Sequence, residues 1–247
     1  MGRVYKQPPL AEALCEFHFD PGSPWDVTLF GHFYDRIRDE FPKKREVPEV
    51  EMSVQQQPGG VAGQIREAGV RMQFIHAGGD AMVQLAPRRL VVNKLPPYES
   101  WPVFKSLILA RLADYEQAVG SASPLQRVGL RYINRFNFPA QSFTVGSAFA
   151  PSEFLPVRLR EAQAAFFVRL EMPQEINERI LLTMGTLDAE QAGTVSVLLD
   201  LEYVVAQPAA IEPSVLSDAL EKAHDRIEQV FESCLTDPLR NRFNQEV

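Results

Sequence analysis

The sequence predicts an α+β fold in which a curved antiparallel sheet carries long helices on one face. Several short segments alternate apolar and polar residues as strands do, and longer segments carry apolar stripes at helical spacing. The order strand, helix, three strands, helix occurs twice along the 247 residues. The chain is 45% hydrophobic and 23% charged, which is typical of a globular protein.

The first half opens with an alternating segment, residues 10–20 ("LAEALCEFHFD"), which predicts a strand. A helix is expected over 23–41, with Ser23 as its N-cap and Pro24 at its first position. The charged, proline-containing segment 42–60 predicts a loop. The apolar stripe expected on the helix comprises Phe30, Phe33, Ile37 and Phe41.

Three short strands are expected next, at about 63–76, 80–86 and 88–94. His76 and Asp80 flank the turn between the first two, and a role in this turn is favoured over a metal site. A helix should follow Ser100, with Pro102 near its start. The segment "PPYESWPVF" before it is interpreted as a helix-entry device, with an aromatic ligand pocket as the alternative. The buried face of this helix is expected to comprise Trp101, Phe104, Ile108, Leu112 and Tyr115.

The second half repeats this order. A long strand is expected at 127–138 ("RVGLRYINRFNF"), and a short helix near 151–161 in spite of Pro156. Three more strands and a final amphipathic helix follow, at 164–172, 179–187, 194–205 and 213–235. The apolar side of the last helix is expected to comprise Leu216, Leu220, Ala223, Ile227, Val230 and Cys234.

Each half therefore has the order β-α-β-β-β-α, which predicts a single domain, 1–247, built from pseudo-repeat halves 8–119 and 124–236. TATA-binding-protein-like and helix-grip folds share such an order, an analogy that carries no function. The halves share negligible sequence identity, so one α+β domain without a repeat is the alternative.

Charge and cysteine content restrict the function classes. The net charge is −7, with most of the surplus in residues 120–247, which disfavours a nucleic-acid ligand because such a ligand calls for a basic face. Cys15 and Cys234 form no disulfide framework, which fits a reducing cytoplasm. The chain has no apolar run long enough to span a membrane and no signal-peptide core at its start. We therefore expect a cytoplasmic protein without a membrane partner.

Three segments together resemble a known family: "PPLAEALCEFHF" near the start, "LPPYESWPVFK" before the second long helix, and "RVGLRYINRFNF" after it. They are similar to the signature blocks of a sporadically distributed family of bacterial proteins of about 250 residues. No activity is established for that family, so the resemblance implies no catalytic residue. Its patchy distribution implies accessory genes, defence systems among them.

The segment 127–138 places an arginine at every fourth position. Because strand side chains alternate, Arg127, Arg131 and Arg135 share one face, and the apolar residues of the other face should pack on the helices. Arginines four apart lie about 13 Å from each other along a strand, too far to bind one phosphate together.

The interpretation we favour is that these arginines pair with carboxylates on neighbouring strands, such as Asp200, Glu202 and Glu171. The alternatives are a polar face that binds an anionic small molecule or protein segment, and a catalytic site. The candidate ligand-binding residues for such a face are Arg131, Arg135, Arg169, Glu16 and His18.

Other chemistry is sparse. No phosphate-binding loop, dinucleotide fingerprint, nucleophile elbow or zinc-protease motif is present. Glu16 and His18 could form an acid/base pair, although a structural histidine is favoured, and Cys15 should be buried. The four histidines are too scattered for a metal site, and we expect neither a metal nor an organic cofactor.

The sequence thus predicts a non-enzymatic binding module with a protein partner or a homo-oligomeric state. The alternative is a sensor or enzyme for a phosphorylated small molecule or nucleotide.

Overall fold

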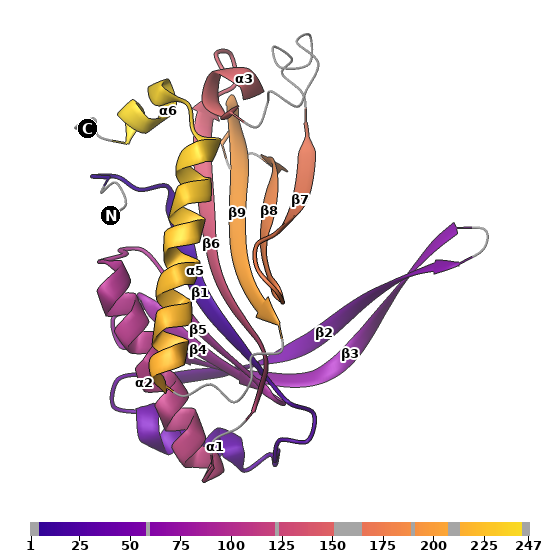
Figure 1. Ribbon diagram of the computed structural model, residues 1–247, viewed down its shortest axis with the longest axis vertical. Helices are drawn as coiled ribbons and strands as arrows, with labels where there is room; N and C mark the ends of the chain where they lie inside the picture. The colour runs from indigo at the N-terminus through magenta and orange to yellow at the C-terminus, as the bar shows by residue number, and fades with distance from the viewer. Residues whose placement is uncertain are drawn as a thin grey trace. The chain divides into compact units, whose positions relative to one another are not determined.

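The computed structural model describes residues 5–57, 60–121, 124–150, 165–188, 191–206 and 213–243, with the backbone alone at 49–57, 60–68 and 213. Nine strands form one antiparallel sheet in the order β2-β3-β4-β5-β1-β6-β9-β8-β7, and five helices lie within the described residues (Figure 1). The predicted α+β class and antiparallel sheet are confirmed. The internal duplication stays a prediction.

The chain divides into two compact units. The N-terminal unit is Cys15–Arg127, and the C-terminal unit combines Met1–Leu14 with Val128–Val247. The predicted strands at 10–20 and 127–138 are confirmed as β1 (Leu10–Phe19) and β6 (Leu125–Pro139), and each contributes residues to both units. Whether the chain is a single domain stays a prediction.

The N-terminal unit contains α1 (Leu29–Ile37), β2 (Lys43–Gln57), β3 (Gly60–Ile75), β4 (Ala81–Ala86), β5 (Arg89–Lys94) and α2 (Trp101–Val119). The predicted strands β3 to β5 and helix α2 are confirmed. Phe74 of β3 packs against Phe33 and Tyr34 of α1, so the helices cover one face of these strands. The five residues expected on the buried face of α2 are all buried.

The predicted loop at 42–60 is wrong, because Lys43–Gln57 forms a strand. β2 pairs with β3 in a long antiparallel ribbon from Lys43↔Ile75 to Gln57↔Gly60 (Figure 1). Pro48, which suggested a loop, is tolerated because β2 is the terminal strand of the sheet, where a missing backbone N–H costs little. The first half therefore has the order β-α-β-β-β-β-α, not the predicted β-α-β-β-β-α.

The predicted start of the first helix is also wrong. Helix α1 begins at Leu29, and Ser23 lies in a turn in which its N–H donates to Asp20 O (2.9 Å). Asp26 Oδ1 accepts the N–H of Thr28 (2.8 Å), and this local bond holds the chain in a turn before the helix. The expected stripe is largely correct, since Phe33, Ile37 and Phe41 are buried and Phe30 is partly exposed.

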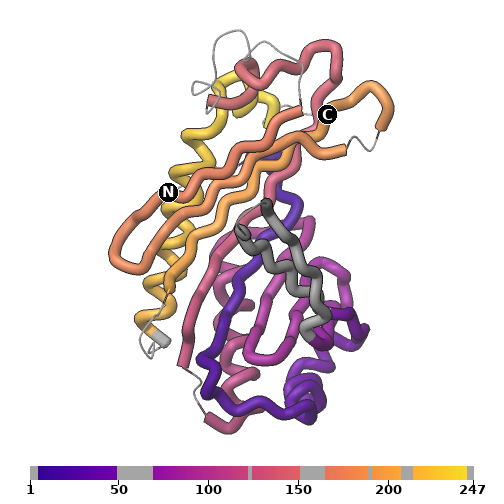
Figure 2. The backbone as a smooth tube through the Cα atoms, turned by 90° about the vertical axis from the view of Figure 1, so that its right-hand side faces the viewer, coloured from indigo at the N-terminus to yellow at the C-terminus, as the bar shows by residue number. Residues whose placement is uncertain are grey.

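The C-terminal unit continues with α3 (Val145–Ala148), β7 (Phe167–Pro173), β8 (Glu178–Leu187), β9 (Thr194–Ala206), α5 (Pro213–Cys234) and α6 (Asp237–Arg242). The predicted strands and the long final helix are confirmed, whereas α3 and α6 were not predicted. Figure 2 shows β7, β8 and β9 running side by side as antiparallel strands. The helix expected at 151–161 lies outside the described residues.

Helix α5 packs on β6 and β9 through its predicted apolar side, of which only Val230 is partly exposed. A cavity of about 10 Å³ remains between Val128, Tyr203 and Leu220, too small for a ligand. In the part of the chain that the structure describes, no helix is long and apolar enough to cross a membrane.

Candidate functional site

Arg131 and Arg135 of β6 lie on the sheet face opposite α5. Val128, Leu130 and Tyr132 are buried toward the helix, and Arg131 and Arg135 alternate with them at intermediate exposure. The predicted division of β6 into two faces is therefore confirmed.

Arg131 forms a two-point ion pair with Asp200 of β9. Its Nε donates to Asp200 Oδ1 (2.8 Å), and its Nη2 donates to Oδ2 (2.5 Å). The Asp200 side chain is only 10% exposed, whereas that of Arg131 is 39% exposed. Parallel bonds of this kind fix both side chains as well as their charges. The favoured interpretation of this arginine, a cross-strand pair, agrees with the observed geometry.

The predicted arginine of β7, Arg169, does not lie beside Asp200. Arg169 lies on β7 opposite Thr183, and Thr183 lies opposite Asp200, so Arg169 and Asp200 are two strands apart, or about 10 Å. Glu171 shares the exposed face of β7 with Arg169 and pairs with Arg179 of β8 (3.1 Å). The structure thus does not bring Arg131 and Arg169 together around one small anion.

Glu16 and His18 belong to β1 in the N-terminal unit. His18 Nε2 is hydrogen-bonded to Glu16 Oε1, and Arg127 Nη1 lies 3.8 Å from the same oxygen. Burial alone would raise the pKa of Glu16, but the hydrogen bond to His18 and the charges of His18, Arg127 and Arg89 outweigh it and lower that pKa. Glu16 is therefore an ionised carboxylate within a basic environment.

On the sheet face that α1 and α2 do not cover, a row of hydrogen-bonded polar side chains crosses strands β2 to β5 of the N-terminal unit. Arg45 Nε donates to Gln73 Oε1 (2.6 Å), Gln73 to Gln84 (2.8 Å), and Gln84 to Asn93 (2.9 Å). The two glutamines and Asn93 are buried, and their mutual bonds compensate for lost water contacts.

A second row of residues runs beside these hydrogen-bonded side chains. The register Met72↔Leu85 places Arg71 next to Ala86, and Ala86 pairs with Arg89. The two arginines are therefore about 10 Å apart, with a small side chain between them. The N–H of Phe19 donates to Arg88 O (2.9 Å), which places His18 beside Arg89.

We call these residues the polar face of the N-terminal unit: Arg45, Arg71, Arg89, Arg127, Glu16, His18, Gln73, Gln84 and Asn93. Glu16 and His18 were predicted from the sequence as members of one face, whereas Arg45, Arg71 and Arg89 were not. The alternation of side chains along the predicted strands could have assigned Arg71 of β3 and Arg89 of β5 to this face. Arg45 could not be assigned in this way, because β2 was interpreted as a loop.

Arg71 differs from the other arginines of this face. Its Nε is shielded from solvent and has no hydrogen-bond partner among the described residues. A buried guanidinium N–H without an acceptor is unfavourable, because the group has lost water and gained nothing in exchange.

A second polar cluster holds the turn between β3 and β4. Asp80 accepts hydrogen bonds from Lys94 Nζ (2.5 Å) and His76 Nδ1 (2.6 Å). The bond from Lys94 is the main reason that the pKa of Asp80 is lowered to about 2, against the opposing effect of burial. Its members bind one another, so the turn role predicted for His76 and Asp80 fits this geometry.

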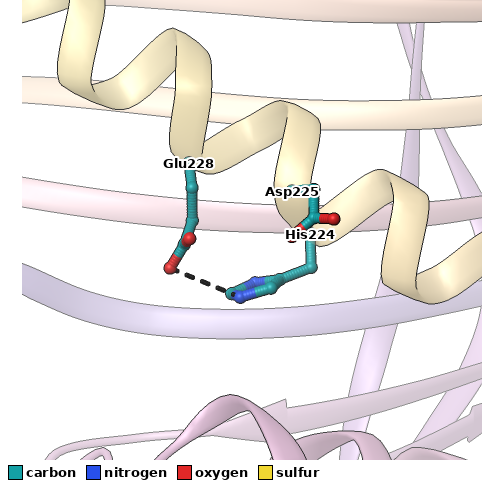
Figure 3. Close-up of side chains that lie close together, drawn as sticks. All are labelled: His224, Asp225 and Glu228. Atoms are coloured by element: carbon teal, nitrogen blue, oxygen red, sulfur yellow. Dashed lines mark ion pairs between the residues drawn. The ribbon is translucent and has the colours of Figure 1, made fainter. Parts of the chain in front are cut away.

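His224, Asp225 and Glu228 form a group of three potential metal ligands on α5 (Figure 3). His224 Nδ1 is hydrogen-bonded to the Tyr132 hydroxyl (2.8 Å), and Nε2 faces Glu228 Oε1 (3.3 Å). Burial, with the charges of Asp225 and Glu232, raises the pKa of Glu228. Both ring nitrogens of His224 thus face protein groups, and the cluster is explained as a link between α5 and β6.

No protein-family model matches the chain, and no curated protein matches it. Among solved structures, the chain is similar to the S. pombe RNA triphosphatase Pct1 in complex with the Spt5 CTD. The two share 10% sequence identity over 94% of this chain and 81% of that chain, with a TM-score of 0.16. A likeness at that level carries no argument about fold or activity, so function must be inferred from this chain's own residues.

Proposed function

We propose that this chain is a non-enzymatic binding module whose N-terminal unit takes the phosphate or carboxylate groups of an anionic ligand on its polar face. The main support is charge balance: the nine residues defined as the polar face, all with described side chains, include four arginines and one carboxylate, Glu16, in a chain of net charge −7. Such a local reversal of sign favours an anionic partner.

The unsatisfied Nε of Arg71 supports the same proposal. Guanidinium groups bind phosphate and carboxylate through paired N–H donors, and Arg71 and Arg89 lie on either side of Ala86 on neighbouring strands. The row of hydrogen-bonded side chains from Arg45 to Asn93 would keep the underlying surface rigid, because each side-chain amide is already bonded to its neighbour.

The proposal includes the cellular location of the protein and the kind of system in which it acts. The resemblance to a patchily distributed bacterial family supports a role in an accessory or defence system, and the cysteine content supports a cytoplasmic location. In such a system the ligand would be a partner's acidic group or a phosphorylated small molecule.

Calorimetric titration of the full chain with inorganic pyrophosphate tests the proposal. We expect binding to the unaltered protein and an affinity at least about tenfold weaker for Arg71→Gln and Arg89→Gln, because each loses a charge-assisted contact. Arg38→Gln is the matched control, since Arg38 is 60% exposed on the C-terminal side of α1 and pairs only with Asp35 among the described residues. No binding, or equal binding by all four proteins, would refute the proposal.

A second candidate function is a sensor or enzyme that acts on a nucleotide. The observation that favours it is the hydrogen bond between Glu16 and His18 on the same face as Arg89, because such a pair can move a proton. Phosphate release from ATP, abolished by Glu16→Gln while pyrophosphate binding is kept, would support this candidate. If no phosphate is released from ATP, the enzyme candidate is refuted and the non-enzymatic binding module is the function that we retain.

A further inference from the structure

Strand β7 is the last strand at one end of the sheet and pairs with β8 (Figure 1). Its residues alternate between exposed and partly exposed, and Phe167 is 72% exposed. The exposed residues on one face are Phe167, Arg169, Glu171 and Pro173.

Among the described residues no strand pairs with the outer edge of β7, and this edge presents the backbone groups of these same residues. The N–H of Thr186 donates to Phe166 O (3.0 Å), and the register continues through Phe167↔Gly185. In a regular antiparallel ladder, hydrogen-bonded pairs alternate, so even-numbered residues of β7 bond to β8. Phe167, Arg169 and Glu171 therefore direct their N–H and C=O groups outward, and Pro173 directs its C=O outward.

We propose that β7 pairs antiparallel with β7 of a second copy of this chain, about a twofold axis through Leu170. In this register Arg169 of each copy lies opposite Glu171 of the other, so both cross-strand pairs join opposite charges. Phe167 lies opposite Pro173, and on the other face Val168 lies opposite Met172.

Other registers are worse. A shift by one residue pairs outward-directed backbone groups with groups already bonded to β8. A shift by two places Arg169 opposite Arg169, or Glu171 opposite Glu171, and like charges directly opposite are destabilising. The ion pair between Glu171 and Arg179 (3.1 Å) is compatible with the dimer, since a carboxylate accepts bonds from several donors. The spacing of charges on β7 thus selects the twofold pairing.

Charged side chains and proline can also protect an edge strand from pairing. Measuring the oligomeric state of the chain and its variants distinguishes this protective role from dimerisation through β7. Sedimentation equilibrium of the full chain over a wide concentration range should show a reversible dimer. Arg169→Glu and Glu171→Arg should each weaken dimerisation about tenfold or more, because each makes both cross-strand pairs like-charged. The double variant Arg169→Glu/Glu171→Arg should restore the dimer.

A mixture gives the sharpest outcome. The Arg169→Glu chain carries two acidic residues on β7 and the Glu171→Arg chain carries two basic ones, so mixing these two weakly dimerising variants should produce a heterodimer. Arg226→Glu on α5 is the control and should dimerise as the unaltered protein does. Circular dichroism checks that each variant is folded.

A monomer at every concentration would overturn the proposal and would mean that Arg169, Glu171 and Pro173 protect the edge. Unchanged dimerisation of the single variants would overturn it too. The inference concerns a surface of the C-terminal unit and does not depend on the anion site.

Discussion

Replacing Arg131 with Gln and Asp200 with Asn, singly and together, should reveal a favourable coupling between the two side chains. Each single change removes one partner of a two-point ion pair (2.8 and 2.5 Å) and leaves the other partner's charge unmatched. Because Asp200 is 10% exposed, Arg131→Gln should cost about 2 kcal/mol in the free energy of unfolding. Because Arg131 is 39% exposed, solvent screening reduces the coupling to about 1–2 kcal/mol.

The assay is urea unfolding of the full chain, followed by tryptophan fluorescence and by circular dichroism, with coincident transitions as the test of two-state behaviour. The double-mutant cycle then isolates the coupling between the pair. Single costs that add to within about 0.5 kcal/mol would refute the view that the pair is structural. Unchanged stability with lost ligand binding would instead assign Arg131 to a ligand site.

Two further predictions follow from the protonation states of side chains. The pKa of Asp80 is lowered to about 2 in the folded protein, below its ordinary value of 3.8, so the stability that this carboxylate contributes is present above about pH 4 and is lost as the pH falls toward 2. Asp80→Asn should therefore flatten the acid side of a curve of unfolding free energy against pH. An unchanged acid side would contradict this. Burial raises the pKa of both cysteine thiols, that of Cys234 to about 12. Cys15 and Cys234 should therefore react with a thiol reagent only after the protein unfolds. Rapid labelling of the native protein would contradict their burial.

Local periodicity explains why much of the fold was predictable from the sequence. Residues 127–138 alternate so regularly that the buried and polar faces of β6 were assigned correctly, and α5 follows from its apolar spacing. The errors fall where local signals conflict. Pro48 and the surrounding charges indicated a loop at β2, and only pairing with β3 and the terminal place of β2 in the sheet make it a strand.

The candidate site was predictable only in part, because partners on distant strands depend on sheet order. Asp200 was among the carboxylates proposed for the arginines, and the structure shows it bound to Arg131. The row formed by Arg71, Ala86 and Arg89 needs the register of three strands, which no local pattern contains. Glu16 and His18 are two residues apart on one strand, so their contact could be predicted directly.

The central claim, that the polar face of the N-terminal unit holds an anionic ligand, is tested most directly by native mass spectrometry of freshly purified protein, repeated after denaturation. We expect a mass excess that disappears on unfolding and is missing from the Arg71→Gln/Arg89→Gln variant. A bare mass from the unaltered protein, with no mass added when pyrophosphate is supplied, would contradict it.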